Sequence, residues 1–179
     1  REHNVFNETH GHAHRVLFDS PVLLYSDFKQ VTELSNEYYK TAQINLCFNG
    51  QEETLSRAVV RITAEAIELA ASGAVLLVLT DRTLAKNQLP IPAAMAVGAV
   101  QTALVEASLR CDTNIVVETA SARDPHHFAV LLGFGATAIY PYLAYESLRK
   151  LVEIGTIKQA ITQTLLNYRN GINKGLYKI

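Results

Sequence analysis

Two short aliphatic runs, 74–80 (AVLLVLT) and 114–119 (NIVVET), constrain the fold more than any other feature of this sequence. Continuous runs of this kind are typical of parallel strands that are covered on both faces. Residues 42–48 alternate apolar and polar side chains, which predicts a third strand. The segment ATAIYPY, residues 136–142, predicts a fourth. Because helical patterns separate the four strands, the sequence predicts βα units on a parallel sheet.

The helical patterns place the expected helices at 27–39, 52–71, 93–109 and 125–132, with one or two more from 144 to the end. Four βα units are too few for an eight-stranded barrel of about 250 residues. A half-barrel, a barrel fragment and a small doubly wound sheet all satisfy the pattern. We favour an α/β fold of parallel βα units that form a partial TIM-barrel-like domain. It would occupy residues 20–179, after an irregular amino-terminal segment, 1–19.

The charge balance and the cysteines exclude several classes of function. The chain has 16 Lys and Arg against 17 Asp and Glu, a net charge of −1, which argues against a nucleic-acid partner. Its apolar stretches are shorter than the 18 or so residues of a membrane span, and its amino terminus lacks the apolar centre of a signal peptide. Two cysteines make no disulfide framework and suggest a reducing compartment. We therefore expect a cytoplasmic protein without membrane contact, and the first residue, Arg1, suggests an excised piece.

Candidate site residues follow the predicted strands, because sites in parallel α/β sheets form at the strands' carboxyl ends. They are Asp81, Arg82, Glu118, Arg123, His126 and His127. The helix that Asp124-Pro125 begins offers free N–H groups to a phosphate or carboxylate, with a histidine as general base. The alternative, which we prefer, is ordinary capping: Asp124 caps the helix, Arg123 pairs with Glu118, and one histidine is packed.

Other reactive side chains are weaker candidates. The amino-terminal histidines His10, His12 and His14 could chelate zinc from one face of an extended segment, but adventitious binding is the preferred interpretation. Neither Cys47 nor Cys111 has a histidine in a recognised nucleophile context, so we expect buried or idle thiols. We therefore predict no metal site.

Long blocks of the sequence resemble a known family. They are LLVLTDR, LPIPAAMAVGAVQTALVEASLR, NIVVETASARDPHHFAVLLGFGATAIYPYLAYE and NYRNGINKGLYKI. Together they resemble the large (alpha) subunit of bacterial NADPH-dependent glutamate synthase, between its amidotransferase domain and its flavin-binding barrel. The segment RVLFDSPVLLYSDF resembles the entry to this part. The likeness runs from about residue 15 to residue 179.

The resemblance implies the carboxyl-terminal portion of a central domain, a rudimentary barrel related to the flavin barrel that follows it. The parent enzyme releases ammonia from glutamine, channels it internally and adds it to 2-oxoglutarate, using flavin electrons to form glutamate. It carries FMN and an iron–sulfur cluster, and its small subunit holds FAD and the NADPH site. The implied partners are the amidotransferase and FMN domains of the same polypeptide and that small subunit.

Little of the family's chemistry transfers to residues of this chain. The amidotransferase nucleophile is an amino-terminal cysteine, whereas this chain begins with Arg1. The residues that bind the cluster and FMN lie beyond the LYKI that ends the chain, and Cys47 and Cys111 match neither set. We therefore expect no catalytic residue and no cofactor in this piece. Its expected role is to link the two domains and to help line the ammonia path, with the six candidates making interdomain or anion contacts. The alternative is a free-standing module that binds a phosphate or flavin phosphate at the Asp124-Pro125 helix start.

Overall fold

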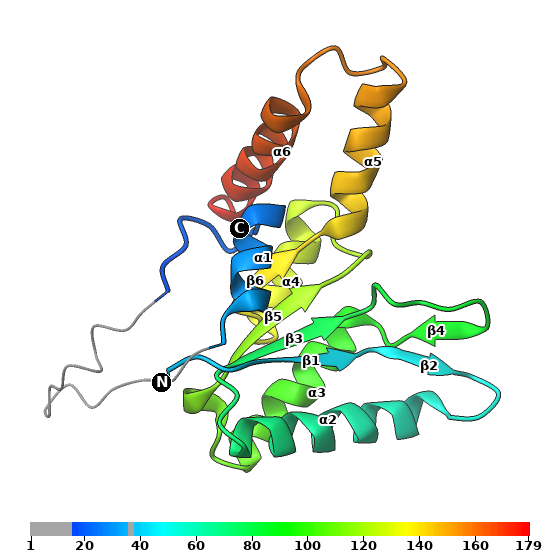
Figure 1. The fold of residues 1–179 in the computed structure, drawn as a ribbon, viewed down its shortest axis with the longest axis vertical. Helices are drawn as coiled ribbons and strands as arrows, with labels where there is room; N and C mark the ends of the chain where they lie inside the picture. The colour runs from blue at the N-terminus through cyan, green and yellow to red at the C-terminus, as the bar shows by residue number, and fades with distance from the viewer. Residues whose placement is uncertain (1–15, 36–37) are drawn as a thin grey trace, which may run out of the picture.

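A parallel four-stranded sheet lies at the centre of the computed structural model, which describes residues 16–35 and 38–179 (Figure 1). Its strands are β1 (Thr41–Asn45), β3 (Leu76–Thr80), β5 (Asn114–Glu118) and β6 (Ala138–Tyr140). They lie side by side in chain order, β1-β3-β5-β6, and every pair is parallel. The four predicted βα units and the α/β class are therefore confirmed.

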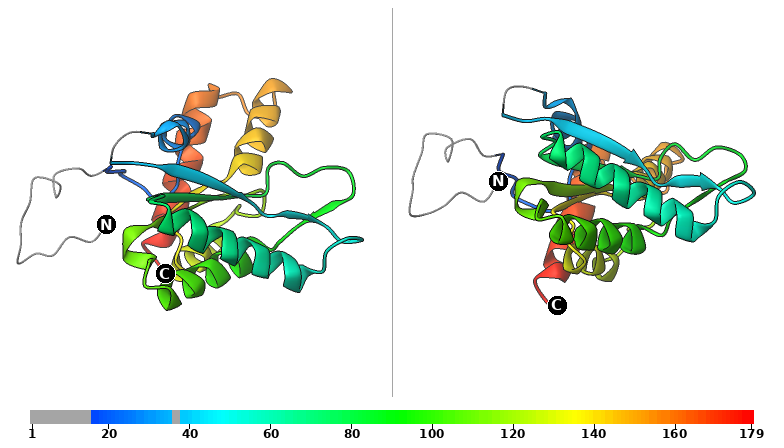
Figure 2. Two further views of the ribbon diagram at one scale, coloured as in Figure 1. Left: turned by 60° about the horizontal axis from the view of Figure 1, so that its bottom comes forward. Right: turned by 90° about the horizontal axis from the view of Figure 1, so that it is seen from below.

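Three crossover helices cover one face of the sheet (Figure 2). They are α2 (Leu55–Ala71), α3 (Ala93–Glu106) and α4 (Pro125–Gly133); a short 3-10 turn, η2 (Arg110–Asp112), precedes β5. Their buried side chains meet the inward residues of the strands in one apolar core, which includes Ile62, Val97 and Phe128. Helices that join consecutive parallel strands lie on one face because each crossover is right-handed.

The opposite face of the sheet is covered by the helices at the two ends of the described chain. They are α1 (Tyr25–Glu33) and α5 (Tyr142–Glu153); α6 (Ile161–Leu176) packs against α4 and α5 and contributes to the apolar cores on both faces. The segment before α1 also extends the sheet, because Val22 pairs in parallel with Ile139 of β6. Both faces are thus buried, as the continuous aliphatic runs require. In the described part of the chain, no helix is long and apolar enough to cross a membrane.

The predicted strand 42–48 is wrong as a single element. After β1, a separate strand β2 (Cys47–Asn49) pairs antiparallel with β4 (Gln88–Pro90), a strand that the sequence did not predict. The break falls at Leu46, whose N–H donates to Thr80 of β3 while its carbonyl accepts from Ile91 after β4. The guanidinium of Arg61 donates to the carbonyls on either side of Leu46, which stabilises the change of partner.

Three predicted helix boundaries and faces also need correction. The helix predicted at 27–39 begins at Tyr25 and ends at Glu33, with the Asp27 carboxylate accepting from the N–H of Leu24. The helix predicted from residue 52 begins at Leu55, because Thr54 caps it. Its spacing predicts an apolar face of Leu55, Val59, Ile62, Ala66 and Leu69. Of these, Ile62 and Ala66 are buried, Val59 and Leu69 are partly buried against the core and Leu55 is exposed, while Ala58 and Ala70 are buried as well. The helix predicted at 93–109 ends at Glu106, and although its sequence is apolar on nearly every side, Met95 and Val105 are exposed.

Two glycines near the end of α4 offer a matched test of this fold. Gly135 has φ +114, and a Cβ there would overlap the side chain of Gln101. We expect Gly135→Ala to lower the free energy of unfolding by about 2 kcal/mol, since L residues resist such a backbone. Gly133 lies in α4 with open space beside it, so Gly133→Ala should raise that free energy by up to about 1 kcal/mol. Urea denaturation measures both, and similar changes for the two variants would contradict this geometry.

Candidate functional site at the carboxyl ends of the strands

A buried carboxylate, Glu118, ends β5 beside the end of β3. The register aligns Thr80 with Glu118, and the Thr80 hydroxyl donates to Oε2 at 2.7 Å. Arg82 follows β3 and donates from Nη1 to the other oxygen, Oε1, at 3.2 Å. The Glu118 side chain is 8% exposed, so burial without these donors would be costly. Both carboxylate oxygens are therefore engaged by donors of the neighbouring strand.

A second buried carboxylate, Asp81, holds the loop that follows β5. Thr119 donates from its hydroxyl to Oδ2 at 2.6 Å, and the N–H of Ala120 donates to Oδ1 at 3.0 Å. The backbone N–H of Asp81 donates in turn to the carbonyl of Glu118. The Cys47 thiol contacts the Asp81 carbonyl at 3.6 Å. Asp81 thus links the end of β3 by hydrogen bonds to the end of β5 and to the first residues of loop 119–124.

The outer part of this site is formed by Arg82 and by the beginning of α5. The Arg82 guanidinium lies over the ring of Tyr142, 4.9 Å from its centroid, and approaches Glu146 at 3.9 Å. Its side chain is 42% exposed and that of Glu146 is 50% exposed. Arg82 therefore joins the buried Glu118 to the solvent-facing edge of the sheet.

The side chains around these carboxylates remain protonated at neutral pH. Burial, reinforced by the Asp81 carboxylate, raises the pKa of the Tyr142 hydroxyl. Burial and the same carboxylate also raise the pKa of the Cys47 thiol. The pKa of Tyr140 is raised by burial, although Arg82 opposes the shift. The raised pKa favours the thiol of Cys47 over the nucleophilic thiolate, and Cys47 is buried as predicted, whereas Cys111 is exposed.

The other three candidates lie at the start of α4. Asp124 caps the helix as predicted: its Oδ1 accepts from the N–H groups of His126 at 2.9 Å and His127 at 3.3 Å. These are N–H groups that a bound anion would need, and the carboxylate adds negative charge beside them. Both histidines are exposed, so the prediction that one is packed is wrong. The predicted pairing of Arg123 with Glu118 is also wrong, because Arg82 occupies that position.

The six candidates therefore form two groups joined by loop 119–124. Asp81, Arg82 and Glu118 belong to one hydrogen-bonded network, and Arg123, His126 and His127 lie at the far end of the loop. The network also contains Thr80, Thr119, Tyr142 and Glu146, which are not among the six candidates. The two threonines adjoin predicted candidates, so the strand ends could have indicated them. Tyr142 and Glu146 depend on where α5 packs, for which the sequence has no local signal.

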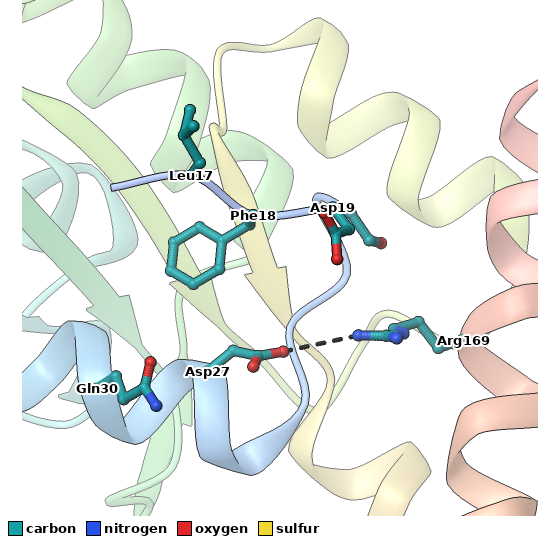
Figure 3. Close-up of a pocket in the computed structure, with 7 residues that line it drawn as sticks. Leu17, Phe18, Asp19, Asp27, Gln30 and Arg169 are labelled. Atoms are coloured by element: carbon teal, nitrogen blue, oxygen red, sulfur yellow. Dashed lines mark ion pairs between the residues drawn. The ribbon is translucent and has the colours of Figure 1, made fainter. Parts of the chain in front are cut away.

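A shallow hollow of about 170 Å³ lies on another part of the molecule, between α1 and α6 (Figure 3). Leu17, Phe18, Asp19, Ser20, Asp27, Gln30 and Arg169 line it. Arg169 lies 3.7 Å from the Asp27 carboxylate, and the Ser20 hydroxyl donates to Asn173 at 2.8 Å. These contacts hold the segment before α1 against α6. The hollow shares no lining residue with the strand-end network.

The described residues 16–35 and 38–179 contain no cluster of metal-binding side chains. No three histidine, cysteine, aspartate or glutamate side chains there are arranged to hold a metal ion. The histidines His10, His12 and His14 lie outside the described residues. The zinc interpretation of that segment is therefore untested.

Comparison with known proteins identifies the family. The family model of the glutamate synthase central domain matches residues 1–179. The glutamate synthase (NADPH) large chain of Azospirillum brasilense is 33% identical over 98% of this chain and 12% of its own length. The glutamate synthase (NADH) of Schizosaccharomyces pombe is 32% identical over 98% of this chain and 9% of its own length. A ferredoxin-dependent glutamate synthase of Synechocystis is 42% identical over 70% of this chain and 9% of its own length. The chain spans about a tenth of the length of these relatives, and it belongs to the glutamate synthase central domain family.

Proposed function

We propose that this chain is the structural centre of a glutamate synthase polypeptide, linking the amidotransferase domain to the FMN-binding synthase domain. The observation that carries the proposal is the family match over all 179 residues, in relatives about ten times longer. The chain would be the carboxyl-terminal portion of the central domain. In the parent reaction, glutamine and 2-oxoglutarate yield two molecules of glutamate, with electrons supplied from outside.

The strand order supports a partial-barrel architecture for this centre. Strands in chain order with their crossover helices on one face form an arc of the kind that makes a barrel wall. A doubly wound sheet would instead reverse its strand order at a switch point. Helices α1 and α5 cover the other face, which in a complete barrel would be closed by further strands.

The strand-end network supports a scaffold role. The buried carboxylates of Asp81 and Glu118 accept hydrogen bonds from the chain's own hydroxyl, N–H and guanidinium groups. Engaged in this way, they stabilise the edge of the sheet rather than present themselves to a substrate. The exposed side chains at that edge, Arg82, Arg123 and His126, are the ones we propose for interdomain hydrogen bonds. We also propose that this edge of the sheet helps to line the ammonia path.

The cofactors and the remaining partner are proposed on the resemblance. FMN and an iron–sulfur cluster would lie in the domain that follows, and FAD with NADPH on a small subunit. The names of the relatives include NADPH, NADH and ferredoxin-dependent forms, so family membership is compatible with three electron donors. NADPH and a cytoplasmic location therefore stay predictions.

Coupling in the full-length enzyme tests the linking role. We expect Arg123→Ala or His126→Ala to raise the glutamine hydrolysed per glutamate formed, because a contact between domains is lost. The increase should be up to about tenfold, the effect of one lost charge-assisted hydrogen bond. Lys158→Ala is the matched control, since Lys158 is an exposed cation in the segment between α5 and α6. Assays of glutaminase and glutamate formation on the same preparation give the ratio, and an unchanged ratio in both test variants would contradict the proposal.

A further inference from the structure

The ring nitrogen Nδ1 of His127 has two neighbours, one of which requires Nδ1 without a proton and the other Nδ1 with a proton. The backbone N–H of Arg123 donates to Nδ1 at 3.3 Å. The Oδ2 atom of the Asp124 carboxylate lies 3.2 Å from the same nitrogen. An imidazole nitrogen without a proton accepts a hydrogen bond, and one with a proton donates. His127 can therefore satisfy only one of these neighbours at a time.

The two protonation states favour different partners. In neutral His127 with its proton on Nε2, Nδ1 accepts from Arg123 while Asp124 accepts from the His127 backbone N–H. This reciprocal arrangement differs from a capping box in its donor, because His127 accepts from the N–H of Arg123, the residue before the N-cap, and not from the N–H of Asp124. In protonated His127, Nδ1 carries a proton and donates to the Asp124 carboxylate. The N–H of Arg123 then loses its acceptor.

We propose that His127 is a proton-operated switch for loop 119–124. One end of the loop is fastened to Asp81 through Thr119 and Ala120. The other end is held by the Arg123 N–H on His127 and by the Arg123 carbonyl, which accepts from the Tyr168 hydroxyl of α6 at 3.0 Å. Protonation of His127 removes one of the two bonds at this end, so the loop loosens where it meets α4 and α6.

The other ionisable groups that face this end of the loop come from α4, α6 and α3. On α4, His126 lies 4.0 Å from Asp124 Oδ1 and competes for that carboxylate. On α6, burial and Asp124 raise the pKa of Tyr168 to about 12, Arg169 pairs with Asp27, and Lys174 is exposed. On α3, Glu106 in the last turn is the one ionisable side chain. His126 is thus the second imidazole beside Asp124, so the test includes a variant that removes it.

The test follows the Arg123 amide and the His127 ring by NMR on the 179-residue chain between pH 8 and pH 5.5. We expect the ring nitrogens of neutral His127 to show the Nε2–H tautomer. The protection of the Arg123 amide, corrected for intrinsic exchange, should fall about fivefold as His127 titrates, the equivalent of one ordinary hydrogen bond. His126→Gln should leave this fall in place.

Two variants of His127 complete the test. His127→Glu and His127→Gln both carry acceptor oxygens and no imidazole, so in each the protection of the Arg123 amide should be the same at both ends of the range. An Nδ1–H tautomer at pH 8, or Arg123 protection that does not follow His127, would overturn the proposal. The inference concerns this chain by itself and stands whether or not the proposed interdomain contacts are made.

Discussion

Replacing Asp81 by alanine should lower the free energy of unfolding by about 3 kcal/mol, because the buried Thr119 hydroxyl and the half-buried Ala120 N–H lose their acceptor. Asp81 is 6% exposed, and its carboxylate accepts from the hydroxyl of Thr119 and the N–H of Ala120. Thr119 is fully buried, so water cannot readily replace the carboxylate. The same substitution frees the beginning of loop 119–124. Chemical denaturation gives the loss of stability, and amide exchange at Ala120 locates it.

Two further variants distinguish this network from a general effect of losing a carboxylate. Asp19→Ala removes an exposed aspartate outside the network and should change the free energy of unfolding by less than about 0.5 kcal/mol. Asp81→Asn keeps one acceptor oxygen but replaces the other by an NH2 group, which cannot accept the hydrogen bond made there. The loss of stability in Asp81→Asn should therefore lie between those of Asp19→Ala and Asp81→Ala. An Asp81→Ala loss no larger than that of Asp19→Ala would contradict the buried network.

Those features of the fold that depend on local chemistry could be predicted from the sequence. The aliphatic runs became β3 and β5, since short runs rich in Val, Ile and Leu suit strands that are covered on both faces. Gly73 follows α2 with φ +92, as expected of a glycine that ends a helix. Asp124 caps α4 with Pro125 at the first helical position. Each of these depends on a few neighbouring residues.

Features that depend on strand register or on helix packing could not be predicted in this way. Arg123 is closer to Glu118 along the chain than Arg82 is, yet the register that aligns Thr80 with Glu118 brings Arg82 to the carboxylate. On α2, the larger apolar side chains Leu55, Val59 and Leu69 were predicted to lie on the buried face. The buried positions are mostly alanines, because α2 packs against α3 and small side chains allow two helices to approach closely. Neither the pairing of Arg82 with Glu118 nor the packing of α2 against α3 can be identified from neighbouring residues in the sequence.

Replacing Phe128 by alanine should cause the largest loss of stability, about 4 kcal/mol, through the cavity left in the core. Phe128 lies in the first half of α4, is fully buried, and belongs to the cluster that α2, α3, α4 and the sheet share. Phe134, just after the same helix, is 52% exposed and provides the matched control. Phe134→Ala should lower the free energy of unfolding by less than about 1 kcal/mol, measured by the same denaturation.

A third substitution separates the loss of core volume from damage to α4 itself. Phe128→Leu keeps most of the apolar volume and should cost less than about 1.5 kcal/mol if packing sets the energy. A similar loss for leucine and alanine would mean that the aromatic ring has a specific role that volume does not replace. Similar losses for Phe128→Ala and Phe134→Ala would contradict the position of α4 on the sheet. In that case the placement of His127 and Arg123 at the carboxyl end of the strands would fail with it, because α4 and the loop before it are anchored to the core through Phe128.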